Sequence, residues 1–344
     1  TWKNLPLPQY DEALLSLLAR PNISSRAALW SQFKYQVGGC MIQGPGAGAA
    51  LLRLPGGNKG IAAAVDCNST YCALDPREGA KRAVAEAARN VACTGARPVA
   101  VTNCLNFPSP EVHEQYWALA ESIGGLAEAC EALETPVVSG NVSLYNEGGG
   151  AAIKPTPVIG MVGLMDDVER VCTIAPKPGQ VLVLLGEIQP LPGGSEYLHL
   201  RCGHSEAPAP KVNLHLEANL CRLLPQAISQ GLVEAAHDVS EGGVALTLAE
   251  MAIASGHGVE VAVIGDGRPD FWLFSECPGA VVAAVSPHHI VALKEMAREH
   301  GVPISHLGHT TDMEVYAVQG LLSLTLDQLK RAWQGKLAEV FASE

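Results

Sequence analysis

The segment TPVVSGNVSLYNE, residues 135–147, is the most informative part of the sequence. A short apolar run ends at residues 139–140, a Ser-Gly pair where we expect a turn, and Asn141, Ser143 and Tyr145 follow at alternate positions. Alternate residues of an extended strand share one face. Glycine lets a backbone approach a phosphate closely, while amide and hydroxyl groups can complete a metal shell or hold a phosphorylated substrate. The segment therefore predicts a ligand-binding edge.

The same pattern also has a purely structural explanation. A polar edge strand that leads into the glycine loop at 148–150 would account for it equally well. A second candidate stretch, TNCLNFPSP at residues 102–110, lies between a predicted strand and a predicted helix, where α/β proteins place ligand contacts. Asn103 and Asn106 are its candidate contacts, and a capped turn is the alternative.

Length and charge restrict the class of protein. A chain of 344 residues is long enough for two domains, because single hydrophobic cores stop growing near ~250 residues. Hydrophobic residues make up 48% and charged residues 17%, as in a compact globular protein. No apolar run approaches the ~18 residues of a membrane span. With a net charge of −12, a nucleic-acid partner is not expected, so a phosphorylated ligand must be held locally, with Mg²⁺.

The cysteines and the first residues indicate the compartment. Ten cysteines occur without a C-x-x-C pair, which argues against a zinc site and predicts reduced thiols in a cytoplasmic protein. The chain starts at Thr1 without a Met and without the basic and apolar regions of a signal peptide. We therefore expect a fragment of a longer chain.

The first part of the chain predicts a packing segment and one domain. Residues 1–45, rich in proline and with a short amphipathic segment, are expected to be a linker that packs on the domain after it. Residues 46–169 form the first predicted domain. Its predicted elements are a hairpin of strands 49–54 and 61–65, helices at 78–91 and 111–133, and strands at 97–102 and 158–164.

Residues 170–344 form the second predicted domain, in which strands and helices alternate as in α/β layering. The apolar run at 181–185 predicts a strand buried on both faces. The other predicted elements are helices at 214–229, 243–255, 288–300 and 326–341 and strands near 259–264, 280–286 and 304–308. In HDVSEGG, residues 237–243, we expect Asp238 or Ser240 to cap a helix whose N–H groups could accept an anion.

These motifs together resemble the phosphoribosylformylglycinamidine synthase family, and most closely the second half of its small bacterial and archaeal synthetase subunit. The resemblance rests on five segments: residues 66–80, 102–107, 139–147, 155–157 and 237–243. It implies the α+β fold of the aminoimidazole ribonucleotide synthetase type, with an N-terminal α+β ATP-binding domain followed by an α/β C-terminal domain. It also implies an ATP-dependent carbon–nitrogen ligase of purine biosynthesis that uses ATP and Mg²⁺.

The resemblance further assigns roles to individual residues. Asn103 and Gly140 would contact ATP, Asn141 would ligate Mg²⁺, and Ser143 would contact the substrate, formylglycinamide ribonucleotide. No residue of this chain is expected to be catalytic. The implied protein partners are the N-terminal half of the same subunit, a glutaminase subunit and a small accessory subunit. An isolated half is expected to form a homodimer, because it has lost its natural mate.

The chain departs from the family pattern where the first half of the subunit carries a lysine, a metal carboxylate and the catalytic histidine. Here residues 64–70 read AVDCNST, and the family's Arg-Asp pair one helix later reads Arg89-Asn90. The acidic residues that remain, which could hold an auxiliary nucleotide and metal, are Asp66, Asp75, Asp238 and Glu276. Two rival interpretations are a stand-alone kinase or synthetase of the same fold and a non-catalytic half that only binds nucleotide.

Overall fold

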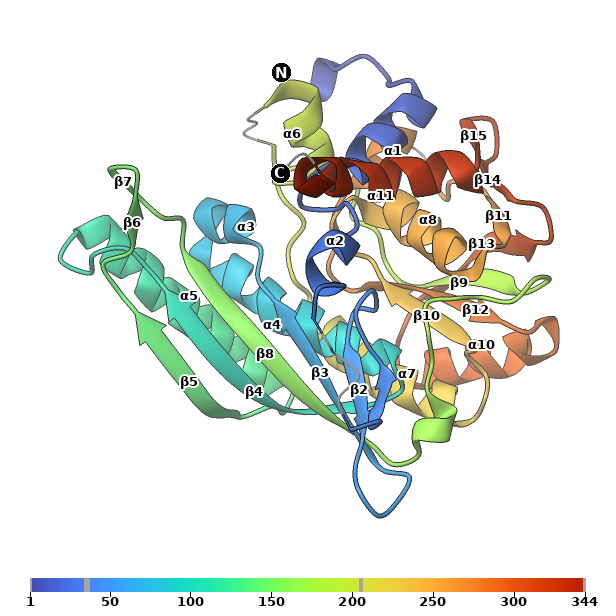
Figure 1. Ribbon diagram of the computed structural model, residues 1–344, viewed down its shortest axis with the longest axis horizontal. Coiled ribbons are helices and arrows are strands. Elements are labelled where there is room, and N and C mark those ends of the chain that lie inside the picture. The colour runs from blue at the N-terminus through green and yellow to red at the C-terminus, as the bar shows by residue number, and fades with distance from the viewer. Residues whose placement is uncertain (1, 34–37, 204–206, 266, 343–344) are drawn as a thin grey trace.

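The structure, a computed structural model, describes residues 2–33, 38–203, 207–265 and 267–342. Its first half is built on a six-stranded sheet with the order β1-β2-β3-β8-β4-β5 (Figure 1). All neighbours are antiparallel except β4 and β5, which run parallel and leave β5 at the edge. The strands are β1 (Met41–Gln43), β2 (Ala50–Arg53), β3 (Gly60–Asp66), β8 (Thr156–Met165), β4 (Arg97–Asn106) and β5 (Val137–Ser143). The predicted hairpin is confirmed as β2 and β3.

Two long helices, α4 (Pro76–Cys93) and α5 (His113–Ala132), cover one face of this sheet. α4 begins at Asp75, whose carboxylate accepts hydrogen bonds from the backbone N–H groups of Arg77 and Glu78 at 3.1 Å. The two helices pack closely, because a Cβ at Gly125 would lie 2.1 Å from the Arg77 carbonyl oxygen. Both helices were predicted and are confirmed. The other face of the sheet is not covered by a helix (Figure 1).

The second half is built on a seven-stranded sheet with the order β10-β12-β9-β13-β11-β14-β15. Its neighbours are antiparallel except β11 and β14. The strands are β10 (Ala235–Asp238), β12 (Ala280–Val285), β9 (Val181–Gly186), β13 (Ile304–Thr311), β11 (Gly258–Val261), β14 (Val315–Val318) and β15 (Leu322–Thr325). A small hairpin beside the first sheet pairs β6 (Glu147–Gly148) with β7 (Ala151–Ala152).

Helices cover both faces of the second sheet. Toward the first half lie α7 (Leu214–Ser229) and α10 (Ile290–Glu299), and the far face carries α1 (Tyr10–Leu18), α6 (Glu196–Cys202), α8 (Gly243–Ser255), α9 (Pro269–Phe274) and α11 (Leu326–Ala342). On β9, Val183 and Leu185 join one buried cluster while Leu182 and Leu184 join the other. The prediction of a strand buried on both faces is confirmed. Short elements complete the chain: η1 (Trp2–Asn4), α2 (Ala27–Trp30), α3 (Ser69–Leu74), η2 (Val168–Arg170) and η3 (Pro287–His289).

The hydrophobic core is continuous between the two halves. One buried cluster extends from the helix-covered face of the first sheet through α4 and α7 to the inner face of the second sheet. The segment before residue 46 contributes to the other cluster, since Leu14, Leu17 and Leu18 of α1 are fully buried beside α11. Within the described residues, no helix combines the length and apolar character needed to cross a bilayer, and no disulfide joins the cysteines.

Two local predictions near the candidate edge are wrong. Residues 139–140 do not form a turn, because β5 continues to Ser143 and pairs with β4 along the way. Tyr145 does not share the face of Asn141 and Ser143, because it follows the strand in the left-handed region with φ 59°. In addition, Asn106 lies within β4, which extends four residues beyond the predicted strand end at residue 102. Backbone pairing between β4 and β5 decides all three positions.

Candidate functional site

The parallel pairing of β4 with β5 brings the predicted site residues together at one edge of the first sheet. The register places Asn103 beside Gly140, Cys104 beside Asn141, and Asn106 beside Ser143. β5 pairs with no second strand among the described residues, so one side of its backbone is available to a ligand. Residues 137–142 of the strand are exposed.

The four predicted residues divide between the two faces of the sheet. Val101 and Leu105, on either side of Asn103, are buried in the core beneath α4 and α5. Because side chains alternate along a strand, Asn103 faces the helices, while Asn141 and Ser143 face the open side. The structure thus brings all four residues to one edge, in two pairs on opposite faces.

Gly140 occupies a position where a side chain does not fit. A Cβ built there would lie 2.4 Å from Oδ1 of Asn103 and 3.1 Å from its Cγ. Any other residue would have to displace the Asn103 amide. The bare backbone of Gly140 and the adjoining amide therefore form a shallow cradle at the exposed edge, as close contact with a phosphate or a nucleotide requires.

On the open face, Asn141 is exposed and Ser143 is held in place. The Asn141 amide donates to Cys104 Sγ at 3.5 Å, its single hydrogen bond within the described part of the chain. Asn146 donates to Ser143 Oγ at 3.1 Å, to the Ser143 carbonyl at 2.9 Å and to the Phe107 carbonyl at 3.1 Å. Asn146 thus positions Ser143. The sequence interpretation missed this role, although an asparagine three residues after a serine in a polar loop is a recognisable local bonding pattern.

The edge fits a metal that arrives with its own ligands. Within the described ranges no group of three or more His, Cys, Asp or Glu side chains is arranged to hold a metal ion. The exposed amide oxygen of Asn141 can supply one neutral ligand, and Mg²⁺ bound to a nucleotide takes most of its shell from phosphates and water. Lys154 adds positive charge at this end of the sheet, where its Nζ contacts Thr70 Oγ1 at 3.1 Å. Asn106 serves the backbone instead, since its amide donates to the Cys104 and Thr156 carbonyls.

A second cluster of functional candidates lies buried between α4 and the second half of the chain. Arg89 is 1% exposed, and its guanidinium contacts Glu217 Oε1 at 2.6 Å and Asp238 Oδ2 at 3.7 Å. Glu217 lies on α7 and Asp238 on β10, so this arginine links the first half to two elements of the second. Burial, followed by the charge of Glu241, raises the pKa of nearby Glu86 well above its ordinary value.

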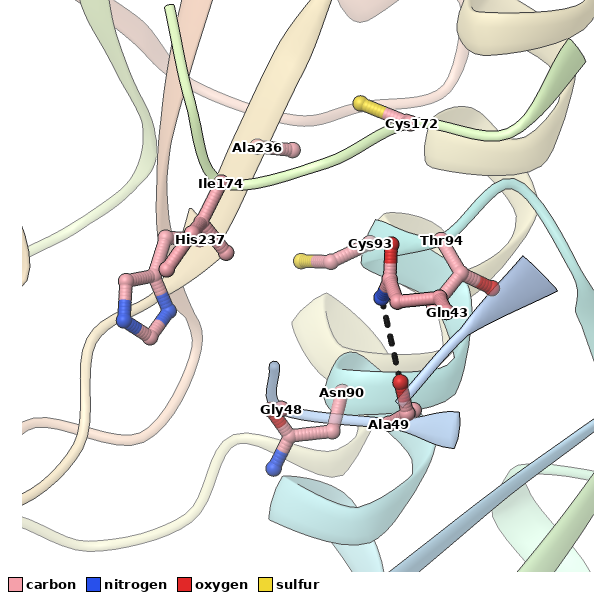
Figure 2. A pocket seen from close by; sticks show the side chains of 10 residues that line it. All are labelled: Gln43, Gly48, Ala49, Asn90, Cys93, Thr94, Cys172, Ile174, Ala236 and His237. Atoms are coloured by element: carbon pink, nitrogen blue, oxygen red, sulfur yellow. Dashed lines mark hydrogen bonds between the residues drawn. The ribbon is translucent and has the colours of Figure 1, made fainter. Parts of the chain in front are cut away.

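Asp66 extends this cluster to the end of β3. Asn90 donates to its carboxylate at 3.1 Å, while burial and then the charge of Asp238 raise the Asp66 pKa to about 7. Burial lowers the pKa of His237, but its hydrogen bonds with Asp238 and Glu250 outweigh that effect and raise it to about 10. Figure 2 shows Asn90 and His237 lining a cavity of about 10 Å³, roughly the space of one water molecule.

Glu276 lies in the same junction with every carboxylate oxygen bonded. Its Oε2 accepts from the Tyr71 hydroxyl at 2.8 Å, and its Oε1 accepts from the backbone N–H groups of Glu196 at 2.8 Å and Gly242 at 3.0 Å. Burial, with the charge of Glu241, raises its pKa to about 7. The guanidinium of Arg82 stacks on the Tyr71 ring at 3.7 Å and donates to the Glu276 carbonyl. Three of the four predicted acidic residues, Asp66, Asp238 and Glu276, thus meet in this junction.

The remaining predictions around this cluster are corrected. Asp75 is not part of it, because its carboxylate caps α4. Neither Asp238 nor Ser240 caps the helix after residue 242, since α8 has Gly242 as N-cap, at φ 79° and with no side-chain cap. The Asp238 side chain is buried and faces Arg89 instead. Electrostatic pairing within the junction has replaced capping as the role of this carboxylate.

The raised pKa of Glu276 predicts a stability that depends on pH. Its pKa in the folded chain is about 7, against an ordinary value of 4.5. Between these values the folded state binds more protons than the unfolded state, so the free energy of unfolding falls as the pH rises. Glu276→Gln keeps an acceptor for both N–H groups and removes the charge. We expect this variant to be ~3 kcal/mol more stable than the parent near pH 8 and about equal to it near pH 4.

Urea unfolding between those two pH values measures this effect. Asp66 keeps its own contribution, so the slope should decrease without disappearing. Glu114→Gln, a change at an exposed position in the first turn of α5, is the matched control and should leave the slope unaltered. A Glu276→Gln variant with the parental slope would contradict the prediction.

The comparisons with known proteins identify the fold. The family described as AIR synthase related protein, N-terminal domain, matches residues 46–165, and its C-terminal domain matches residues 177–320. The chain belongs to the AIR synthase related protein family. The expected fold, an α+β domain followed by an α/β domain, is confirmed, whereas the boundaries at residues 45 and 169 remain predictions.

Among the relatives, the similarity points to one enzyme. The chain is 44% identical, over 98% of its length, to the phosphoribosylformylglycinamidine synthase subunit PurL of Moorella thermoacetica. It covers 47% of that protein, so it spans about half the length of the curated relatives it matches.

Solved structures show the same architecture. Thermotoga maritima PurL complexed with FGAR matches with a TM-score of 0.75 at 20% identity, covering 95% of this chain and 54% of that one. PurL of the same organism complexed with ATP matches with a TM-score of 0.73 at 19% identity, with coverage of 95% and 53%. At this level of identity the likeness establishes the fold alone.

Proposed function

We propose that the chain is the C-terminal half of the synthetase subunit of phosphoribosylformylglycinamidine synthase. This enzyme is an ATP-dependent carbon–nitrogen ligase that converts formylglycinamide ribonucleotide to formylglycinamidine ribonucleotide in de novo purine biosynthesis, in the cytoplasm, with ammonia from glutamine. The 44% identity with a PurL subunit over nearly the whole chain supports the proposal. The observation that carries it is the edge formed by β4 and β5, where Gly140, Asn141 and Ser143 offer a bare backbone, a free amide and a positioned hydroxyl.

Each residue at this edge has a proposed role. ATP contacts the Asn103 amide and the Gly140 backbone, Asn141 provides a neutral ligand to Mg²⁺, and Ser143 binds the ribonucleotide. When bound, Mg²⁺ neutralises phosphate charge and thereby supports phosphoryl transfer. The chain's own contribution is to position the ligands, because a reaction of this kind depends on alignment more than on covalent help from the protein.

The N-terminal half of the same subunit is the proposed mate of the first sheet. The open face of that sheet carries exposed apolar side chains, including Val65 at 71% and Leu164 at 44% exposure. A contiguous apolar face of this kind marks an interaction surface. In the complete enzyme the N-terminal half would cover it and supply the lysine, histidine and metal carboxylate that residues 64–70 lack. A glutaminase subunit and a small accessory subunit complete the proposed assembly.

Substitutions at the edge test this proposal in the full-length subunit. Asn141→Ala and Ser143→Ala are each expected to lower kcat/KM for ATP-dependent ammonia ligation by ~100-fold, because each removes a group that positions a reacting ligand. Ser139→Ala is the matched control, since Ser139 lies on the same face two residues before Asn141. Near-normal activity of both variants would contradict the proposal and support the rival in which this half only binds nucleotide. A stand-alone kinase or synthetase would instead transfer phosphate without the N-terminal half.

A further inference from the structure

A cavity of about 540 Å³ lies at the junction of the two halves, away from the β4–β5 edge. Its walls come from the β2–β3 loop, the start of β4, the end of β8 and the second half of α7. β4 has ten residues, so its start is ~30 Å from Asn106 at its other end. The apolar part of the lining consists of Leu164, Met165, Pro225 and Ile228. Cavities of ~300–1,000 Å³ at domain junctions are typical of small-molecule sites.

Basic side chains from four different segments line this cavity. They are Lys59, Arg97, Arg170 and Arg222, against two carboxylates, Asp166 and Asp167. The charge of the cavity is therefore opposite to that of the chain, whose net charge is −12. Asp167 is already engaged, because its Oδ1 accepts a hydrogen bond from the Glu169 N–H at 3.1 Å.

Two of the arginines have unused hydrogen-bond donors. Over the ranges that the structure describes, the arginine side chains that form neither a hydrogen bond nor an ion pair are those of Arg97, Arg170 and Arg298. Two of these three line the cavity. Lys59 likewise makes no side-chain contact with a described residue. Converging cations without partners above an apolar floor are complementary to an anion that carries an apolar part.

We propose that this cavity binds a small phosphorylated metabolite. The planar guanidinium groups of Arg97 and Arg170 match phosphate oxygens in bidentate geometry, and Lys59 adds a point charge. The apolar floor receives the uncharged part of the ligand. A concave site enclosed by both halves favours a small molecule over an acidic protein segment. The bound ligand joins the end of the first sheet to α7, independently of the function proposed for the β4–β5 edge.

Calorimetric titration of this chain with pyrophosphate tests the proposal. The double variant Arg97→Gln/Arg170→Gln is expected to raise the Kd by at least ~10-fold, because it removes two charge-assisted contacts. Arg298→Gln/Arg331→Gln removes the same charge at exposed positions on α10 and α11 and should leave the Kd unchanged. Asn141→Ala should also leave it unchanged, which separates this site from the β4–β5 edge. Thermal unfolding confirms that all variants remain folded.

Three results would overturn the assignment. The first is the absence of saturable pyrophosphate binding to the parent chain. The second is an equal Kd in the two double variants, which would mean that binding follows total charge. The third is tighter binding of a hexaglutamate peptide than of pyrophosphate, which would assign the cavity to an acidic segment of a protein partner.

Discussion

Replacing Arg89 by Met is expected to lower the free energy of unfolding by ~3–5 kcal/mol, the usual cost of removing one partner from a buried ion pair. The side chain is 1% exposed and sits between Glu217, which is fully buried, and Asp238, which is 1% exposed. Methionine preserves much of the aliphatic volume. The loss therefore reports the two carboxylates left in the junction without a cation.

Urea denaturation measures this loss, with Arg331→Met as control. Arg331 is 80% exposed and pairs with Asp327 one turn away on α11, so its replacement should cost less than ~0.5 kcal/mol. Adding Glu217→Gln to Arg89→Met should recover part of the stability, because one of the two unpaired charges disappears. A loss below ~1 kcal/mol in the single variant would show that Arg89 does not hold the junction together.

The long elements could be predicted from the sequence because their patterns repeat. The predicted bounds of α7 and α8 agree with the structure, since helical periodicity extends over several turns in each. The run at 181–185 contains no polar residue, and β9 is indeed buried on both faces. By contrast, α3, α6 and α9 have six or seven residues each, and the prediction missed them. Elements this short do not complete enough turns for a periodic pattern to be detected.

The candidate site could be predicted only in part. Alternation along residues 139–143 placed Asn141 and Ser143 on one face, as in β5. That Asn103 and Gly140 face the opposite side depends on the register between β4 and β5, which local sequence does not encode. The expected turn at residues 139–140 failed for the same reason, because the ladder with β4 overrides the local preference of a Ser-Gly pair. Likewise, Glu217 lies 128 residues from Arg89, so no local pattern connects them.

Arg89 shows how a departure from the family pattern can acquire a structural role. The resemblance predicts a functional Arg-Asp pair at this point of the helix in the first half of the subunit, and here the pair reads Arg89-Asn90. The arginine now joins α4 to α7 and β10, and Asn90 bonds the remaining carboxylate of Asp66. Both residues thus hold the two halves of the chain together. The open chemistry of this chain is confined to the β4–β5 edge.

The isolated chain is expected to show no measurable ligation of ammonia to formylglycinamide ribonucleotide, whatever the ATP concentration. The edge supplies amides, a hydroxyl and bare backbone, none of which can transfer a proton near neutral pH. Residues 64–70 contain no lysine or histidine, so the missing groups must come from the N-terminal half. A coupled assay of ADP release measures this. Turnover by the chain alone at the rate of the intact subunit would contradict the prediction.

Addition of the separately produced N-terminal half should restore turnover, because it covers the open face of the first sheet and completes the site. The same half mixed with the Asn141→Ala chain should not restore it, which separates a shared active site from simple stabilisation of the partner. Without its mate, the chain should shield Val65 and Leu164 by forming a homodimer. Light scattering should then show the homodimer giving way to a heterodimer as the N-terminal half is added. A strict monomer at high concentration would show that the open face is not an interface.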